Sequence, residues 1–376
     1  MTPLDTAHLH GRADDRVTDA VARLDAALAG DPELSFQAAA FHRGVPVLDV
    51  WGGRHLGEDS VLVPFSVTKN TIGITIGLLV ERGLLDLDDL VADHWPEFAA
   101  AGKQRVTVRQ LLSHQAGLAQ TDPPLDRFDA LDQPVAAARL AATRPLWHPG
   151  SAFGYHGVTI GNLGAELIHR VTGRTMHAYY EEEIRAPHGI DFFLGLPADQ
   201  EHRRVDLQSM TPPAAGVGDR QPTALGVRVF GSAPPTPDVA NDPRSWRYGH
   251  PATSGTGSAR GIARLLAAAV TGVEGAAPFL SADTVAQIGQ QQVHGYDEVL
   301  GQHDRAHAIV FQKPTAAMPF GGVNAFGHDG AAGGLACVDP ETGIAFAWTI
   351  ARGAWPGGGD PRAIALAAEL GRLFAG

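Results

Sequence analysis

The positions of the strand-like segments constrain the fold of this chain most. Residues 35–53 have the pattern of two strands around a turn, and residues 305–351 have the alternating, apolar pattern of further strands. The sequence between these regions is mostly helical or irregular in pattern. Because strand backbones must pair with one another, one sheet built from both ends of the chain fits best. We therefore expect an α/β sheet domain formed by residues 1–65 and 250–376, with a mainly helical region over residues 66–249.

Apolar residues three or four positions apart predict helices in much of the remaining sequence. The length of 376 residues is too great for one simple core, so two subdomains or one large composite domain fit it. The DPETG segment at residues 339–343 predicts a hairpin turn between two strands. The expected helices cover residues 15–28, 66–82, 106–118, 157–173, 257–270 and 361–374.

The predicted helix at residues 66–82 contains the longest apolar run that could be mistaken for a membrane segment. This run, IGITIGLLV, spans only nine residues from Ile72 to Val80. A bilayer needs about 20 apolar residues in a helix, so lipid is excluded by length. A helix that is apolar on nearly all sides is instead expected in the centre of a protein core.

Charge and cysteine content exclude several classes of partner. The formal net charge is −12, which gives no electrostatic basis for binding nucleic acid or an anionic membrane surface. The single cysteine, Cys337, excludes an internal disulfide and a cysteine-rich zinc site. The first residues, MTPLDTAHLHGRADDRV, have no apolar stretch of the signal-peptide type, which predicts a cytoplasmic location.

Several common catalytic motifs are missing from the sequence. It has no H-E-x-x-H, no phosphate-binding G-x-x-x-x-G-K and no G-x-S-x-G nucleophile motif. The GTGSARG segment at residues 255–261 only approximates a dinucleotide-binding loop and has no fitting acidic partner. None of the 17 histidines has metal-ligand spacing with a carboxylate. We therefore expect neither a cofactor nor a metal.

Ser66 and Lys69, in the segment PFSVTKNTIG, form the most informative pair of polar residues. Serine is a common helix cap, so the spacing alone could mark only the start of a helix. However, only three of the 29 basic residues are lysines, namely Lys69, Lys103 and Lys313. A buried lysine can lose its proton near neutral pH, whereas arginine cannot. Residues three apart lie on one helical face, so the amine of Lys69 can reach the hydroxyl of Ser66 and act as a base.

Three segments resemble the serine β-lactamase and penicillin-binding protein superfamily, and most of all its family VIII carboxylesterases. SVTK resembles the S-x-x-K motif of the superfamily and is followed by a similar segment up to residue 118. Residues 145–173, PLWHPGSAFGYHGVTIGNLGAELIHRVTG, resemble its tyrosine segment, and residues 326–352 resemble its last active-site strand. The resemblance extends from about residue 37 to the C-terminus. It implies a β-lactamase/DD-peptidase-like fold, with an antiparallel sheet flanked by helices and a mainly helical inserted region.

The resemblance also implies the roles of individual residues. Ser66 matches the nucleophile that forms an acyl-enzyme, and Lys69 matches the lysine that activates it. Tyr155 matches the tyrosine of the Y-x-N motif and would exchange a proton with them. The sequence does not show whether Lys69 or Tyr155 is the general base, because coupled groups titrate as a pair.

The final strand segment supplies the rest of the implied site. The sequence HDG, His328 to Gly330, stands where the superfamily has K-T-G. His328 is expected either to line the substrate pocket or to brace the strand. The backbone N–H groups of Ala331 and Ser66 would form the oxyanion hole.

Two departures from the superfamily pattern bear on the substrate. Gly157 stands in place of the asparagine of Y-x-N, and His328 lacks the permanent charge of the K-T-G lysine. In the superfamily these groups help to bind the amide and carboxylate of β-lactams or peptides, so a neutral small-molecule ester or thioester is expected instead. His114 is expected to be structural, and the side chain of His156 to point away from that of Tyr155.

The resulting hypothesis is a serine carboxylesterase that cleaves short-chain esters. An acyltransferase with an alcohol acceptor remains open, and its acceptor site would lie in residues 120–140 and 200–250. A weak β-lactamase or peptidase activity, or a non-catalytic binding scaffold, are further alternatives. The sequence does not indicate the oligomeric state.

Overall fold

A computed structural model describes residues 1–126, 128–211, 222–231 and 233–375. Within these ranges, one antiparallel sheet contains seven strands in the order β1-β2-β4-β3-β11-β10-β9, and β5/β6 and β7/β8 form two short pairs. The strands are β1 (Thr2–Pro3), β2 (Leu9–Ala13), β3 (Phe36–His42), β4 (Val45–Gly52), β5 (Phe192–Phe193), β6 (Thr256–Gly257), β7 (Val293–Asp297), β8 (Gln302–His307), β9 (Phe326–Asp329), β10 (Leu335–Asp339) and β11 (Ile344–Ile350).

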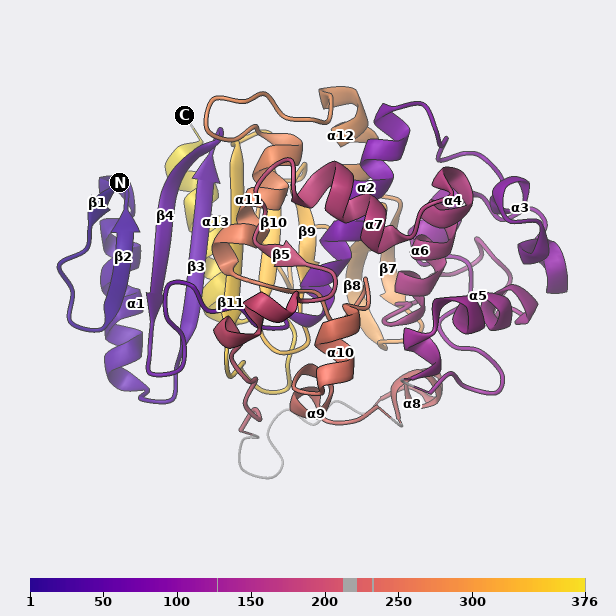
Figure 1. Ribbon diagram of the computed structural model, residues 1–376, viewed down its shortest axis with the longest axis horizontal. Helices are drawn as coiled ribbons and strands as arrows, with labels where there is room; N and C mark the ends of the chain where they lie inside the picture. The colour runs from indigo at the N-terminus through magenta and orange to yellow at the C-terminus, as the bar shows by residue number, and fades with distance from the viewer. Residues whose placement is uncertain (127, 212–221, 232, 376) are drawn as a thin grey trace.

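The helices cover both faces of this sheet and fill the middle of the chain. They are α1 (Thr18–Gly30), α2 (Lys69–Glu81), α3 (Val91–His94), α4 (Val108–Leu112), α5 (Gln133–Ala142), α6 (Thr159–Thr172), α7 (Met176–Tyr180), α8 (Ala224–Phe230), α9 (Thr236–Ala240), α10 (Pro243–Tyr248), α11 (Ala259–Val270), α12 (Ala282–Gly289) and α13 (Pro361–Phe374). In Figure 1, α11 lies in front of the sheet and α13 behind it.

The large sheet joins the two ends of the chain, as its strand pattern predicted. Strand β3 pairs with β11 over its whole length, from Phe36 opposite Ile350 to His42 opposite Ile344. Side chains of β11 alternate between two cores: Ala345 and Ala347 face the α2 and α11 side, whereas Phe346 and Trp348 face the α1 and α13 side. The division at residues 65 and 250 stays a proposal about domain boundaries.

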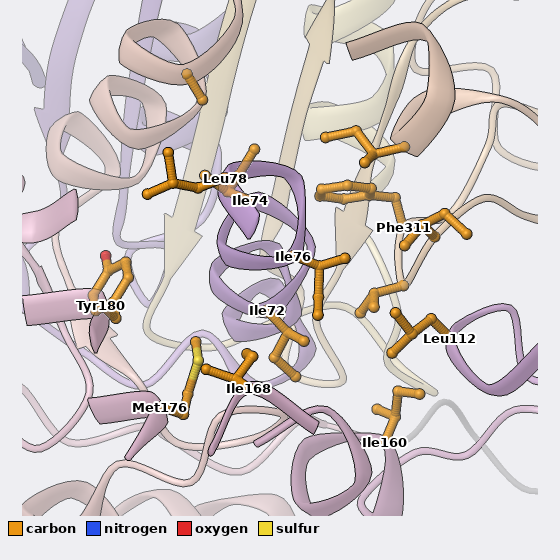
Figure 2. Close-up of a cluster of buried hydrophobic side chains, with 14 of the residues drawn as sticks. Ile72, Ile74, Ile76, Leu78, Leu112, Ile160, Ile168, Met176, Tyr180 and Phe311 are labelled. Atoms are coloured by element: carbon orange, nitrogen blue, oxygen red, sulfur yellow. The ribbon is translucent and has the colours of Figure 1, made fainter. Parts of the chain in front are cut away.

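Helix α2 is buried on nearly all sides, as its apolar sequence predicted. Its residues from Lys69 to Leu79 are buried, and they pack against α6, α7, α11 and α12 (Figure 2). Two glycines permit this close packing. A Cβ atom on Gly73 would lie 2.2 Å from the ring of Phe311, and one on Gly77 would lie 2.9 Å from the side chain of Ile288. In the part of the chain that the structure describes, no helix is long and apolar enough to cross a membrane.

Two predicted elements are shorter than the sequence suggested. The helix expected over residues 106–118 ends at Leu112, although Thr107 caps it in a capping box as expected. His114 and Gly117 then adopt positive φ angles of 65° and 71°, which end the helix and turn the chain. The strand expected over residues 305–312 ends at His307 and is followed by an irregular segment.

Candidate active site

Ser66 lies in a tight turn immediately before α2. The 3₁₀ turn Phe65–Thr68 leads directly into the helix and places Ser66 half-buried at its start. Phe65 has a positive φ angle of 50°, which is unfavourable for a large side chain. The turn therefore holds the serine in a conformation that must be stabilised by its surroundings.

Lys69 is fully buried beside this serine. Its Nζ lies 2.9 Å from Ser66 Oγ and donates to the backbone carbonyls of Gly157 at 2.7 Å and Ala252 at 2.9 Å. Burial lowers the pKa of Lys69 well below 10.5, although the charge of Asp329 opposes this shift. The surroundings of Lys69 thus favour a neutral amine.

Tyr155 completes a group of three polar side chains. It precedes α6, and its Oη donates to Ser66 Oγ at 2.7 Å. Lys69 Nζ lies 5.0 Å from the centre of the tyrosine ring. Burial raises the pKa of Tyr155 above its ordinary value of 10, which favours the protonated phenol. The structure therefore brings together the three residues that the sequence proposed as catalytic.

Asp297 holds the backbone of Tyr155, and the sequence analysis missed it. Its buried carboxylate accepts the Tyr155 N–H on both oxygens at 3.1 Å, and its Oδ1 also accepts the N–H groups of Val299 at 2.9 Å and Leu300 at 2.8 Å. Burial alone would raise the pKa of Asp297, but the nearby His307 and these N–H groups outweigh it and lower the pKa. No local motif could reveal this contact, because 142 residues separate Asp297 from Tyr155.

Three buried histidines lie in this region, and the rings of two of them, His114 and His307, contact the ring of Tyr155. His114 Nδ1 accepts the backbone N–H of His156 at 3.1 Å, and His156 Nε2 accepts that of Leu118 at 2.7 Å. The ring of His307 lies parallel to that of Tyr155, with centres 6.2 Å apart. Burial lowers the pKa of all three histidines, to about 4 for His156. His114 bonds backbone near the site, as expected of a structural residue, and the ring nitrogens of His156 bond to Leu118 and Gly154 rather than to Tyr155.

His328 is fully buried at the end of β9 and faces Tyr155. The centres of the two rings are 5.7 Å apart. His328 Nδ1 donates to the Asp329 carbonyl at 2.7 Å, and the Asp329 carboxylate is held by Gln312 Nε2 at 2.8 Å. Burial lowers the pKa of His328 to about 4, so this imidazole is neutral at pH 7. Its contacts at the end of β9 are those of a residue that braces the strand, and a role in lining the substrate pocket stays a prediction.

The turn after β9 approaches the serine turn closely. A Cβ atom on Gly330 would lie only 2.1 Å from the carbonyl oxygen of Pro64, so only glycine fits there. Ala331 follows in an exposed position. Among the described residues, the backbone N–H groups of Ala331 and Ser66 make no hydrogen bond, so both can bind an oxyanion.

An apolar wall takes the place of the asparagine that is missing from Y-x-N. A Cβ atom on Gly157 would lie 2.7 Å from the Phe230 ring and 3.2 Å from the Tyr155 ring. Phe230, at the end of α8, packs with Trp147 and Val299 in a small apolar cluster. Any side chain at position 157 would therefore require the Phe230 ring to move.

The arrangement suits acyl transfer through a serine nucleophile. A hydroxyl lies between a desolvated amine and a phenol, and two unused N–H groups lie on neighbouring turns. No group of histidine, cysteine or carboxylate side chains within the described ranges has the geometry of a metal site.

Comparisons with known proteins identify the family and the fold. The Beta-lactamase family matches residues 23–369. The esterase/beta-lactamase LipL of Mycobacterium tuberculosis is 32% identical over 328 residues, which make up 82% of this chain and 75% of LipL. The structure of EstA from Arthrobacter nitroguajacolicus Rue61a matches with a TM-score of 0.90 and 38% identity, covering 96% of this chain and 98% of EstA. A family VIII carboxylesterase matches with a TM-score of 0.88 and 28% identity, covering 98% and 99% of the two chains. The predicted fold class is therefore confirmed.

Proposed function

Since this chain belongs to the beta-lactamase family, we propose that it is a serine ester hydrolase that forms an acyl-enzyme on Ser66. The observation that carries the proposal is the contact of Ser66 Oγ with Lys69 Nζ at 2.9 Å and with Tyr155 Oη at 2.7 Å. The esterase/beta-lactamase LipL and the family VIII carboxylesterase, which are 32% and 28% identical to this chain, support the same reaction.

The hydrogen-bond geometry supports Lys69 as the general base. A neutral amine has two N–H groups and one lone pair. Two backbone carbonyls, those of Gly157 and Ala252, accept hydrogen bonds from Lys69 and account for both N–H groups. The lone pair then points to the Ser66 hydroxyl, which can give up its proton as Oγ attacks the ester carbonyl carbon.

Tyr155 is proposed to carry the proton onward to the leaving group. Its raised pKa keeps the phenol protonated, so it can donate to the departing alkoxide and take the proton held by Lys69. The ester C–O bond breaks and leaves the acyl group on Ser66. Water then attacks the acyl carbon, and Tyr155 and Lys69 accept its proton and return a proton to Ser66 Oγ, which frees the serine. The N–H groups of Ser66 and Ala331 would stabilise the oxyanion by about 2.7–4 kcal/mol each.

The surroundings of the site support an ester without a charged group. His328 is neutral, so it offers no fixed positive charge for a substrate carboxylate. Phe230, Trp147 and Val299 present an apolar surface beside Tyr155. An alcohol acceptor in place of water would bind in residues 120–140 and 200–250, of which residues 127, 212–221 and 232 lie outside the described part of the chain.

The test is hydrolysis of p-nitrophenyl butyrate by the wild type and by Ser66→Ala, with intact-mass spectrometry of both proteins after mixing. The wild type should turn over and gain the mass of a butyryl group, whereas the variant should do neither. Equal activity of the variant would refute the role of Ser66. If the wild type is acylated but turns over only when an alcohol is added, the protein is an acyltransferase.

A further inference from the structure

The three lysines of the chain have three different surroundings, and only one of them belongs to the site described above. Lys103 is buried, and its amine is fully occupied by three backbone carbonyls, those of Ala100, Ala141 and Thr143, at 2.6–2.9 Å. Lys313 is only 4% exposed, yet its amine makes no hydrogen bond or ion pair with any described residue. Lys313 Nζ is not one of the fully buried polar atoms that lack a partner, so the amine is the solvent-facing end of an otherwise buried side chain.

Lys313 lines a hollow in the protein surface of about 900 Å³. The hollow lies between α12, which is at the top edge of Figure 1, the loop at residues 323–324 and the turn at residues 340–341. None of the residues proposed as catalytic lines it. Its walls combine apolar side chains such as Val270, Leu280 and Val285 with the amides of Gln287 and Asn324. It is thus a separate cavity with a mixed lining and one lysine amine.

Burial makes the Lys313 amine easier to deprotonate than an ordinary lysine. Burial lowers the pKa of Lys313 to about 8, against the opposing charge of Asp339. The Asp339 carboxylate is used elsewhere, because it accepts the backbone N–H groups of Gly322 and Glu341 at 3.1 and 3.0 Å. At pH 8 about half of the Lys313 amine is therefore neutral and nucleophilic, and at pH 7 about a tenth.

We propose that this hollow is a second ligand site, in which Lys313 Nζ binds a small uncharged aldehyde or ketone covalently as an imine. The amine attacks the carbonyl carbon and a C–N bond forms. The carbonyl oxygen takes up protons and leaves as water, which creates the C=N bond. Asp283 and Glu341, which also line the hollow, disfavour an anionic ligand. The inference does not depend on the proposed esterase activity.

The experiment compares the three kinds of amine within one protein. The full chain is incubated at pH 8 with propanal and cyanoborohydride, which reduces each imine to a stable secondary amine. Chymotryptic peptides then give the rate of labelling at Lys313, at Lys103 and at the amino group of Met1. Lys103 is the matched control, because its pKa is also lowered to about 8 but its amine is occupied. Glyoxylate replaces propanal in a second arm.

We expect propanal to label Lys313 at least about tenfold faster than Lys103, because Lys103 must first release three hydrogen bonds. Relative to Met1, glyoxylate should label Lys313 less than propanal does. Lys313→Arg should lose only the label at this position, because arginine cannot form the imine. Labelling of Lys313 no faster than that of Lys103 would overturn the proposal. A preference for glyoxylate at Lys313 would overturn the assignment of an uncharged ligand.

Discussion

Replacing Asp297 by asparagine should weaken catalysis more than it weakens the fold. The change keeps the size of the side chain and Oδ1, which accepts from Tyr155, Val299 and Leu300, but removes the charge. A hydrogen bond to a charged group is worth about 1.5–3 kcal/mol, against about 1 kcal/mol for a neutral one. Over three N–H groups the loss is about 1.5–6 kcal/mol. A fold with a stability of about 5–15 kcal/mol tolerates this, with Tm lower by about 5–10 °C.

The effect on the reaction follows from the position of Tyr155. Asparagine presents an amide N–H₂ where Oδ2 accepted the Tyr155 N–H, so the tyrosine backbone must shift. A displacement of about 1 Å in a reacting group can cost about 10²-fold in rate. We expect kcat for p-nitrophenyl butyrate to fall by about this factor, while KM stays near the wild-type value because Asp297 lies behind the tyrosine.

A double-mutant cycle separates positioning from general damage. If Asp297 acts through the tyrosine, Asp297→Asn should have little further effect on kcat in a Tyr155→Phe background. Fully additive losses in kcat would refute this reasoning. Asp304→Asn is the matched control, because Asp304 is a carboxylate in the neighbouring strand β8 with a positive φ angle, which asparagine tolerates. This variant should keep wild-type activity.

The same substitution has a pH signature. Folding lowers the pKa of Asp297, so its carboxylate contributes stability that is present above the ordinary pKa of 3.8 and is lost as the pH falls through the lower folded value. The difference in unfolding free energy between the wild type and Asp297→Asn should therefore shrink on acidification. Chemical denaturation between neutral pH and pH 3 measures it, and a difference that is constant over this range would show that the charge is not involved.

The remaining predictions concern the reacting groups. Lys69→Arg should lower kcat/KM by about 10²–10⁴-fold although it keeps a long basic side chain, because arginine cannot accept a proton; retained activity would exclude the lysine as base. Tyr155→Phe should lower kcat by about 10²-fold or more, and stopped-flow acylation should show whether the loss lies in the first step. Because only the neutral amine of Lys69 can act as the base, kcat/KM should rise with pH through the lowered pKa of Lys69 and level off well below pH 10.5. A rise of kcat/KM centred at the ordinary lysine pKa would contradict the buried-base mechanism. EDTA should leave the rate unchanged, and strong inhibition would indicate a metal requirement.

The sequence predicted the parts of the site that depend on short spacings. Ser66 and Lys69 are three residues apart, and the resemblance supplied Tyr155, which lies beside them in the structure. The helix expected to continue to residue 118 stops at Leu112 because His114 turns the chain and bonds to His156, and this tertiary contact leaves no periodic signal. Asp297 was missed for the same reason.

The surroundings of Lys69 could be predicted from the sequence only in part. The scarcity of lysine and the apolar run after it predicted a buried amine, and burial is observed. The small number of lysines does not predict which hydrogen-bond acceptors each lysine amine has. Lys103 and Lys313 are both buried, but one has three carbonyl partners and the other has none among the described residues. The acceptors of a buried amine depend on which distant segments of the chain pack beside it, and a single sequence does not show this packing.

The pairing of β3 with β11 has a consequence for biosynthesis. The two strands are separated by roughly 300 residues of chain, so the centre of the sheet can close only when the last part of the protein has left the ribosome. Until then β3 is an unpaired apolar edge, which exposes the nascent chain to aggregation. The turn at Gly330 that packs on the serine turn arrives equally late. An incomplete chain therefore has the serine and lysine but not the complete site, and hydrolytic activity should appear only on synthesis of the C-terminal strands.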